Sequence, residues 1–335
     1  MSRRILVVCQ GWVGDVVMAQ SLLKLLRRRD PDCRIDVIAP KPHGALVERM
    51  AEVSEFLAAP GGHGEFSPAA HWRMGRRLRP RRYDQAIILP GSLKSALVPF
   101  IAGAKLRTGF LGEKRYGLLN DIRHGREQMA TVDSFIALGL APGEALDGPV
   151  PRPELAVDPR SQARLADLHG IDRERPLAVL APGAEFGVSK RWPVEYFAET
   201  ARALAARGWQ VATIGSPKEA EAGAAVASGC ESVIDLCGKT SLGDTVDLLG
   251  LARVAVTNDS GLMHIAGAVG AHVVAMYGST SPAKVSPLTP RADVFFLGLP
   301  CSPCRQRTCP LGHHECMTKI LPSSVIAAAV AAGEA

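Results

Sequence analysis

The first half of the chain alternates short apolar runs with longer stretches of helical periodicity. The apolar runs lie at 3–9, 34–39 and 83–89, and the helix-like stretches that follow them lie at 15–29, 43–51 and 92–102. Strand and helix signals in alternation are typical of βαβ units around a parallel sheet.

The same alternation restarts in the second half. Expected strands lie at 176–183, 209–215, 232–238, 253–261 and 272–278, with expected helices at 193–207, 218–228, 241–250, 260–269 and 322–332. Between them, residues 141–160 carry five prolines, which favours a linker. We therefore expect an α/β protein with two Rossmann-like domains and a cleft between them. The expected boundaries are 1–150 for the N-terminal domain, 151–171 for the linker, 172–320 for the C-terminal domain and 321–335 for a closing helix.

The composition agrees with a globular protein of this size. The 335 residues are 47% hydrophobic, which suffices for two cores. No apolar run approaches the roughly 20 residues that cross a bilayer, and the N-terminus lacks a signal peptide. We therefore expect a cytoplasmic protein with reduced thiols.

Positive charge gathers in the first half of the chain. The net charge is +6, and residues 71–82 alone contain six arginines. This run indicates either an anionic partner or a solvated helix face. Nucleic acid is not the expected partner, because aromatic residues make up only 5% of the chain and no nucleic-acid-binding motif occurs.

The first strand-loop-helix turn, GWVGD at 11–15, resembles a phosphate-binding loop but departs from it. The third glycine of a dinucleotide loop is missing, which disfavours an NAD-dependent dehydrogenase. Asp15 stands at the expected helix start, where its negative charge would repel a phosphate. Asp15 is the N-cap of this helix or a general base that faces the cleft, and the two roles are compatible if only one carboxylate oxygen caps.

The segment 181–193 of the second half is a better anion site. It follows an expected strand and offers small and basic residues, namely Gly183, Gly187, Ser189, Lys190 and Arg191. Ligands of open α/β sheets bind at the carboxyl ends of the strands, where this loop lies. The interpretation competes with a surface loop that happens to carry basic residues.

A second phosphate signal follows the strand at 253–257. Asp259 and Ser260 are candidate caps of the next helix, and Gly261 permits a ligand to approach its free N–H groups. His264 lies about one turn into that helix. It either contacts a ligand or is a histidine packed in the core. The turn at 277–282 ends another strand at the same edge and suggests a third wall of one pocket.

The cysteine-rich loop leaves two interpretations open. Its thiols, at Cys301, Cys304, Cys309 and Cys316, are spaced C-x2-C-x4-C-x6-C. Four thiols this close would bind a structural zinc ion tetrahedrally, although the spacing is not a standard finger pattern. The alternative is a set of free thiols on an exposed loop.

Taken together and in this order, these motifs resemble the lipopolysaccharide heptosyltransferases of glycosyltransferase family 9. The stretches that carry the resemblance are GWVGDVVMAQSL, LPGSLKSALVPFIAG, RTGFLGEKRYGLLND, PGAEFGVSKRWP and TNDSGLMHIAGA. They span roughly residues 4–282. The motif NDSG, where type I members tend to have DTG, favours type II activity.

The resemblance implies a GT-B fold, with an acceptor-side N-terminal domain and a donor-side C-terminal domain. The last helix is expected to cross back to the N-terminal domain. It implies inverting transfer of L-glycero-D-manno-heptose from ADP-heptose to the first heptose of the inner core, on heptosyl-Kdo2-lipid A. Peripheral contact with the anionic inner face of the inner membrane is expected. No cofactor is required, and a divalent metal ion is neither implied nor excluded.

Residue roles follow from the same resemblance. Asp15 is the implied catalytic base. The implied donor-binding residues are Gly183, Ser189, Lys190, Arg191, Asp259, Ser260, Gly261 and His264. On the acceptor side we expect Gly14, Ser92, Lys94 and Arg115.

Other activities stay open at this stage. They are heptose transfer to another core position by a type I or type III enzyme, a nucleotide-sugar epimerase with the GT-B fold, and an anionic-lipid-binding module without catalysis. Release of ADP that depends on an acceptor distinguishes the transferase from the epimerase.

Overall fold

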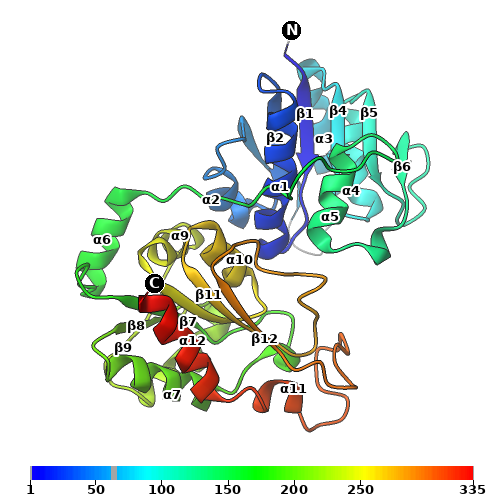
Figure 1. The fold of residues 1–335 in the computed structure, drawn as a ribbon. Coiled ribbons are helices and arrows are strands. Elements are labelled where there is room, and N and C mark those ends of the chain that lie inside the picture. Colours follow the sequence, from blue (N-terminus) through cyan, green and yellow to red (C-terminus); the bar gives the residue numbers. More distant parts are fainter. Residues whose placement is uncertain (1, 62–65, 335) are drawn as a thin grey trace. The chain divides into compact units, whose positions relative to one another are not determined.

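The computed structural model describes residues 2–61 and 66–334. The chain divides into two compact units, unit 1 (1–153) and unit 2 (154–335), each built around a six-stranded sheet (Figure 1). All strand pairs are parallel. The expected α/β class with two Rossmann-like domains is thereby confirmed.

The sheet of unit 1 has the strand order β3-β2-β1-β4-β5-β6. Its strands are β1 (Arg4–Val8), β2 (Arg34–Ala39), β3 (Glu55–Ala58), β4 (Gln85–Ile88), β5 (Leu106–Phe110) and β6 (Asp121–Arg123). The chain direction across the sheet reverses between β1 and β4. Loops at the carboxyl ends of these two strands therefore diverge, which is where open sheets bind ligands.

Helices cover the sheet of unit 1 in pairs. Helix α1 (Val13–Arg29) packs against α5 (Thr131–Gly139), and α3 (Pro68–Leu78) packs against α4 (Leu93–Ile101), while α2 (Gly44–Val47) is a single turn. In α3 the buried positions are His71, Met74, Gly75 and Leu78, an i, i+3, i+4, i+7 pattern. A Cβ atom on Gly75 would lie 2.5 Å from Cβ of Ile101, so α3 and α4 are in close contact.

Unit 2 repeats this architecture with the order β12-β11-β10-β7-β8-β9. Its strands are β7 (Leu177–Ala181), β8 (Gln210–Thr213), β9 (Val233–Asp235), β10 (Val254–Asn258), β11 (His272–Tyr277) and β12 (Ala292–Phe296). Its helices are α6 (Pro159–His169), α7 (Val194–Ala205), α8 (Ala220–Ser228), α9 (Leu242–Leu251), α10 (Gly261–Ala268), α11 (Glu315–Thr318) and α12 (Pro322–Glu334).

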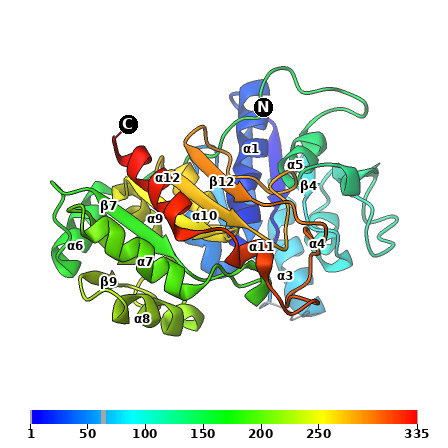
Figure 2. The same ribbon diagram turned by 60° about the horizontal axis from the view of Figure 1, so that its bottom comes forward.

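Two segments differ from the expected domain scheme. The segment 151–171, expected as a linker, contains α6, which packs against α9 of unit 2. The closing helix α12 packs against α7 and β10, and its apolar residues join the core around Trp209. We expected this helix on the N-terminal domain, but its small apolar side chains belong to the core of unit 2. Figure 2 shows α12 running beside α7.

Across residues 2–61 and 66–334, every helix is too short or too polar to cross a bilayer.

Candidate active site

Asp15 lies in the first turn of α1, at the carboxyl edge of the unit 1 sheet. The helix begins at Val13 and Trp12 is its N-cap, with the Val16 N–H donating to the Trp12 carbonyl (3.0 Å). Asp15 is therefore the third residue of the helix, and the expectation that it is the N-cap was wrong. The Trp12 side chain makes no capping hydrogen bond. Asp15 is half-buried and lies where the helix dipole favours a negative charge.

Gln10 connects Asp15 to an arginine. In the amide orientation that satisfies both neighbours, Gln10 Nε2 donates to Asp15 Oδ2 (2.9 Å) and Gln10 Oε1 accepts from Arg126 Nη2 (2.6 Å). Arg126 also donates to the Leu89 carbonyl at the end of β4 (3.3 Å). Burial and the nearby charge of Asp15 raise the pKa of the Cys9 thiol to about 12, so Cys9 stays protonated.

The structure places the expected acceptor-side residues at the same edge of unit 1, in different environments. Gly14 is buried in α1, Ser92 is the N-cap of α4, and Lys94 is half-buried in the first turn of α4. Arg115 is 1% exposed and donates to the carbonyls of Ser92 (3.1 Å) and Phe110 (2.7 Å). The pKa of Arg115 is lowered mainly by burial and, to a smaller extent, by the neighbouring positive charge of Arg126. Arg115 therefore ties the loops after β4 and β5 together.

One arginine of the 71–82 run is also structural. Arg81 donates to Asp36 Oδ2 and to Glu55 Oε2, both at 2.7 Å. The hydrogen bond from Arg81 lowers the pKa of the Glu55 carboxyl. This arginine holds η2 (Arg79–Arg81) against β2 and β3 and is not free for a ligand.

In unit 2, Asn258 fixes the loop that follows β7. Its Oδ1 accepts from the Trp192 N–H (2.9 Å), and its Nδ2 donates to the carbonyls of Pro182 (2.9 Å) and Gly183 (3.1 Å). The Asn258 side chain is fully buried, and both N–H groups of its amide donate hydrogen bonds. Both ends of the loop 182–192 are thus held at the carboxyl end of β10.

An ion pair lies beside this loop. Lys190 Nζ is 2.6 Å from Asp259 Oδ2, and the two side chains are 14% and 4% exposed. Thr280, from the turn after β11, donates to the same carboxylate oxygen (2.5 Å). The predicted third wall of the pocket therefore reaches the expected donor residues.

The start of α10 adjoins the ion pair. Ser260 is its N-cap without a side-chain cap bond, so the first N–H groups keep their capacity for an anion. His264 is 5% exposed, and its Nδ1 lacks a partner among the described residues. Burial lowers the pKa of His264 to about 4, which keeps the imidazole neutral at pH 7.

Other expected donor residues have structural contacts. Ser189 Oγ is hydrogen-bonded to Ser279 Oγ (2.9 Å) and to the Gln306 carbonyl (2.5 Å). Gly183 leaves room for Glu219, since a Cβ there would lie 1.8 Å from Glu219 Oε1. Arg191 is half-buried at the end of η4 (Val188–Lys190).

The sequence alone did not point to Arg307. Its guanidinium lies 5.6 Å from the ring centre of Phe186, and Lys190 Nζ lies 5.1 Å from the same ring. The Ser189 N–H donates to the Arg307 carbonyl (3.1 Å), which anchors the cysteine-rich loop to the donor loop. The only sequence signal was a basic residue between the cysteines.

The four cysteines of that loop line one small cavity with His313 and His314. Hydrogen bonds from backbone N–H groups, led by that of His314, lower the pKa of the Cys309 thiol. In the part of the chain that the structure describes, no three His, Cys, Asp or Glu side chains are arranged to hold a metal ion. All eight cysteines are free thiols.

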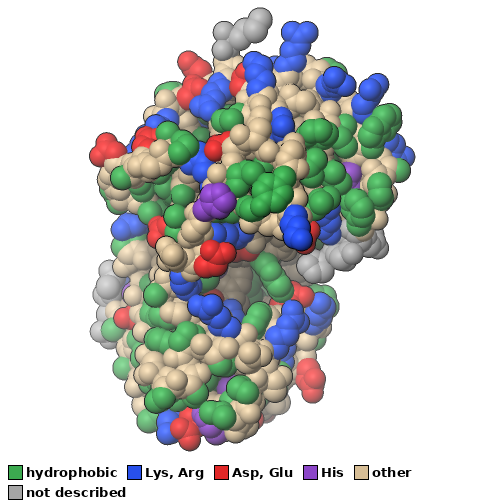
Figure 3. All heavy atoms as spheres, turned by 90° about the vertical axis from the view of Figure 1, so that its right-hand side faces the viewer, with side chains coloured by type: hydrophobic (Ala, Val, Ile, Leu, Met, Phe, Trp, Pro, Cys, Tyr) green, Lys and Arg blue, Asp and Glu red, His purple; other side chains and the backbone are tan. Residues whose placement is uncertain are grey.

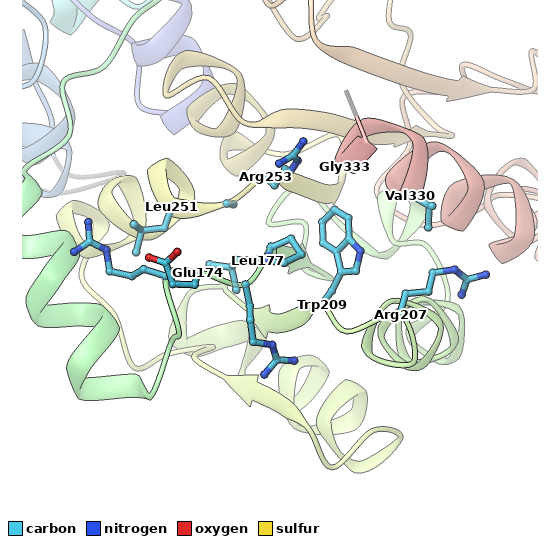
Figure 4. Close-up of a pocket in the computed structure, with 12 residues that line it drawn as sticks. Glu174, Leu177, Arg207, Trp209, Leu251, Arg253, Val330 and Gly333 are labelled. Atoms are coloured by element: carbon cyan, nitrogen blue, oxygen red, sulfur yellow. The ribbon is translucent and has the colours of Figure 1, made fainter.

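A separate cavity of unit 2 lies away from these residues. It is lined by Leu177 at the start of β7, by Trp209 and Arg253, and by Gly333 of α12 (Figure 4). Because Leu177 begins its strand, this cavity lies at the amino edge of the sheet. The candidate donor residues lie at the carboxyl edge.

Comparison with known proteins adds to this geometry. Residues 71–315 match the model of glycosyltransferase family 9 (heptosyltransferase). The chain is 39% identical to lipopolysaccharide heptosyltransferase 2 of Escherichia coli (strain K12) and 40% identical to that of Salmonella typhimurium, over 96% of each chain.

Solved structures agree with the sequence matches. The structure of E. coli ADP-heptose LPS heptosyltransferase II superposes with a TM-score of 0.87 at 38% identity, covering 99% of this chain and 100% of that one. A family 9 glycosyltransferase from Veillonella parvula shares the fold with a TM-score of 0.85 at 21% identity, over 98% of this chain and 97% of that one. The predicted GT-B fold is confirmed, and the chain belongs to glycosyltransferase family 9, the heptosyltransferases.

Proposed function

We propose that this protein is a lipopolysaccharide heptosyltransferase of type II. It transfers L-glycero-D-manno-heptose from ADP-heptose to the first heptose of the inner core. The names of relatives that align over nearly the whole chain support this substrate pair. The observation that carries the proposal is the lysine–aspartate pair beside the start of α10, where a nucleotide diphosphate would find both a cation and free N–H groups.

The proposed reaction is a single displacement with inversion. An acceptor hydroxyl oxygen forms a bond to the anomeric carbon, the bond from that carbon to the diphosphate oxygen breaks, and ADP leaves with the electron pair. Asp15 accepts the proton of the attacking hydroxyl. Its place in the first turn of α1 and its hydrogen bond from Gln10 support this role, because both favour the ionised carboxylate.

Lys190 stabilises the charge that develops on the departing diphosphate. Its ammonium group has three N–H donors, and the Asp259 carboxylate takes one of them at 2.6 Å. The N–H groups at the start of α10 add further donors. Together they supply positive charge without a divalent ion, so the proposed reaction calls on no cofactor.

The acceptor, heptosyl-Kdo2-lipid A, is anchored in a bilayer. The proposed place of work is therefore the cytoplasmic face of the inner membrane, with the protein in peripheral contact with its anionic leaflet.

The test combines purified protein with ADP-heptose and the acceptor, and measures ADP release. We expect release only when the acceptor is present, because an epimerase would not need it. We expect Asp15→Asn to lower kcat by about 10²–10⁴-fold, since it removes the proposed base. Asp133→Asn is the matched control, because Asp133 is exposed at the same position of the first turn of α5.

The same variants are compared in cells that lack the second core heptose. Restoration of the core by the wild type but not by Asp15→Asn supports the proposal. Failure of the wild type would refute the type II assignment, and full activity of Asp15→Asn would refute the base role.

A further inference from the structure

The net positive charge of the protein comes from one sixth of its length. Residues 66–120 contain eleven Lys and Arg residues and two Asp and Glu residues, a net charge of +9. Because the whole chain carries +6, the remaining residues together carry −3. The charge is therefore concentrated on one part of unit 1, the part that builds α3, β4, α4 and β5.

The same segment carries most of the exposed large apolar side chains of unit 1. They are Phe66, Trp72, Leu93, Phe100, Leu106 and Tyr116, each between 38% and 65% exposed. Outside this segment, the described part of unit 1 exposes one other such side chain, Trp12. Exposed aromatic rings next to basic residues are typical of surfaces that bind the headgroup region of a bilayer.

Helices α3 and α4 bring these two kinds of side chain together. Trp72 and Arg76 are one turn apart on the exposed side of α3, and the guanidinium lies 5.3 Å from the ring centre. Arg107 stacks in the same way on Phe100 of α4, at 5.4 Å. Figure 3 shows a face of unit 1 on which hydrophobic and basic side chains lie next to one another.

A merely solvated basic helix explains this surface less well. Such a helix usually alternates its charges, but the two acids of the segment are already engaged. Asp84 pairs with Lys105 (2.8 Å), and Glu113 accepts from the Leu93 N–H (2.7 Å). Among the described residues, no carboxylate forms an ion pair with Arg73 or Arg76. A solvated helix also gives no reason to expose Trp72 at 55%.

We propose that the α3–α4 surface, defined by Trp72, Arg73, Arg76, Phe100 and Arg107, docks unit 1 on an anionic lipid bilayer. The arginines bind lipid phosphates, and the two aromatic rings insert at the level of the headgroups. Arg107 is fixed by its bonds to the carbonyls of Ala104 and Leu118 (both 2.7 Å), and its guanidinium lies over the Phe100 ring. This proposal deepens the proposed function, since a bilayer would present the acceptor to unit 1.

The first test uses vesicles without any lipopolysaccharide, so that it does not depend on the reaction. Full-length protein is sedimented with vesicles of phosphatidylethanolamine and phosphatidylglycerol, or of phosphatidylcholine alone. We expect binding to the anionic vesicles, loss of binding at high salt, and weak binding to phosphatidylcholine.

Two pairs of variants distinguish the contribution of the arginine charges to vesicle binding from that of the inserted aromatic rings. Arg73→Gln with Arg76→Gln should weaken binding about 30-fold, because each basic residue at an anionic surface contributes roughly a factor of five. Trp72→Ser with Phe100→Ser should weaken it about 10-fold or more. The matched control is Arg160→Gln with Arg173→Gln, two exposed arginines of unit 2, and it should bind as the wild type does.

A second measurement distinguishes this proposal from the proposed function. The surface variants should keep wild-type kcat on a deacylated, water-soluble acceptor and lose activity on the acceptor embedded in vesicles. Equal binding of all variants to anionic vesicles would overturn the docking proposal. Wild-type binding to phosphatidylcholine that is as strong as binding to the anionic vesicles would overturn it as well. Loss of activity by the surface variants on the soluble acceptor would also overturn it, because the surface would then bind the acceptor itself.

Discussion

Removal of the Gln10 side chain tests whether a hydrogen bond from Gln10, polarised by Arg126, stabilises the ionised carboxylate of Asp15. With its amide in the orientation that satisfies both neighbours, Gln10 donates to Asp15 at 2.9 Å and accepts from Arg126 at 2.6 Å. The positive charge of Arg126 polarises the amide, and the amide N–H then stabilises the ionised carboxylate. Gln10→Ala removes this hydrogen bond without touching Asp15.

The size of the effect follows from the type of bond. A hydrogen bond to a charged group contributes about 1.5–3 kcal/mol. Since 1.36 kcal/mol corresponds to one pH unit, the acidic limb of the kcat profile should move about one to two units toward higher pH in Gln10→Ala. The direction follows because a lost donor disfavours the charged form.

The assay measures kcat against pH with both substrates saturating. Gln128→Ala is the control, since Gln128 is exposed and lies in the same 3-10 helix as Arg126. Arg126→Met should move the acidic limb in the same direction, and should add little when Gln10 is already alanine. An unmoved limb in Gln10→Ala, or fully additive effects of the two substitutions, would refute the reasoning.

Two further predictions concern stability. Burial lowers the pKa of His264 to about 4 in the folded protein, against 6.5 in the unfolded chain. As the pH falls between these values, the unfolded chain binds a proton that the folded protein does not. The free energy of unfolding therefore decreases over this range. Urea unfolding should therefore show the wild type losing about 2 kcal/mol more than His264→Gln between pH 7 and pH 5, and equal losses would contradict the assignment. Gly333→Ala should destabilise the protein by about 1–3 kcal/mol, because the new Cβ would lie 2.0 Å from Trp209 Cζ2. The control is Ala331→Ser on the exposed side of α12, which should change stability little. A Gly333→Ala variant that is more stable than the wild type, as for an ordinary helical glycine, would show that α12 does not pack on Trp209 in this way.

The apolar patterning was sufficient for most of the central strands. The sequence predicted β1, β7, β10 and β11 because each is a continuous buried run between turn signals. It predicted no strand at β3, β5, β6 or β12. Of these, β3, β6 and β12 lie at the edges of their sheets and are largely half-buried or exposed. Strand β5 lies inside its sheet, but its sequence, LRTGF, has no continuous apolar run. Edge strands share their pattern with loops, so periodicity does not distinguish them.

The candidate site was predictable where its residues adjoin strong strands. Lys190 and Asp259 each follow such a strand, and the carboxyl ends of parallel strands meet at one edge of the sheet. The start of α1 was placed two residues too late, because Trp12 gives no capping signal. Arg126 and Arg307 reach the site from loops whose conformation depends on tertiary contacts, such as the bond of Ser189 to Arg307.

The ion pair between Lys190 and Asp259 also bears on the end of the proposed catalytic cycle. A buried lysine without a partner would retain the nucleotide after transfer, because releasing the product would leave an uncompensated charge. Asp259 lies 2.6 Å from Lys190, and Thr280 donates a hydrogen bond to the same carboxylate. In the proposed cycle, Lys190 would therefore return to this carboxylate as ADP departs. In this cycle Asp259 would compete with the product for Lys190, which would favour turnover over tight product binding.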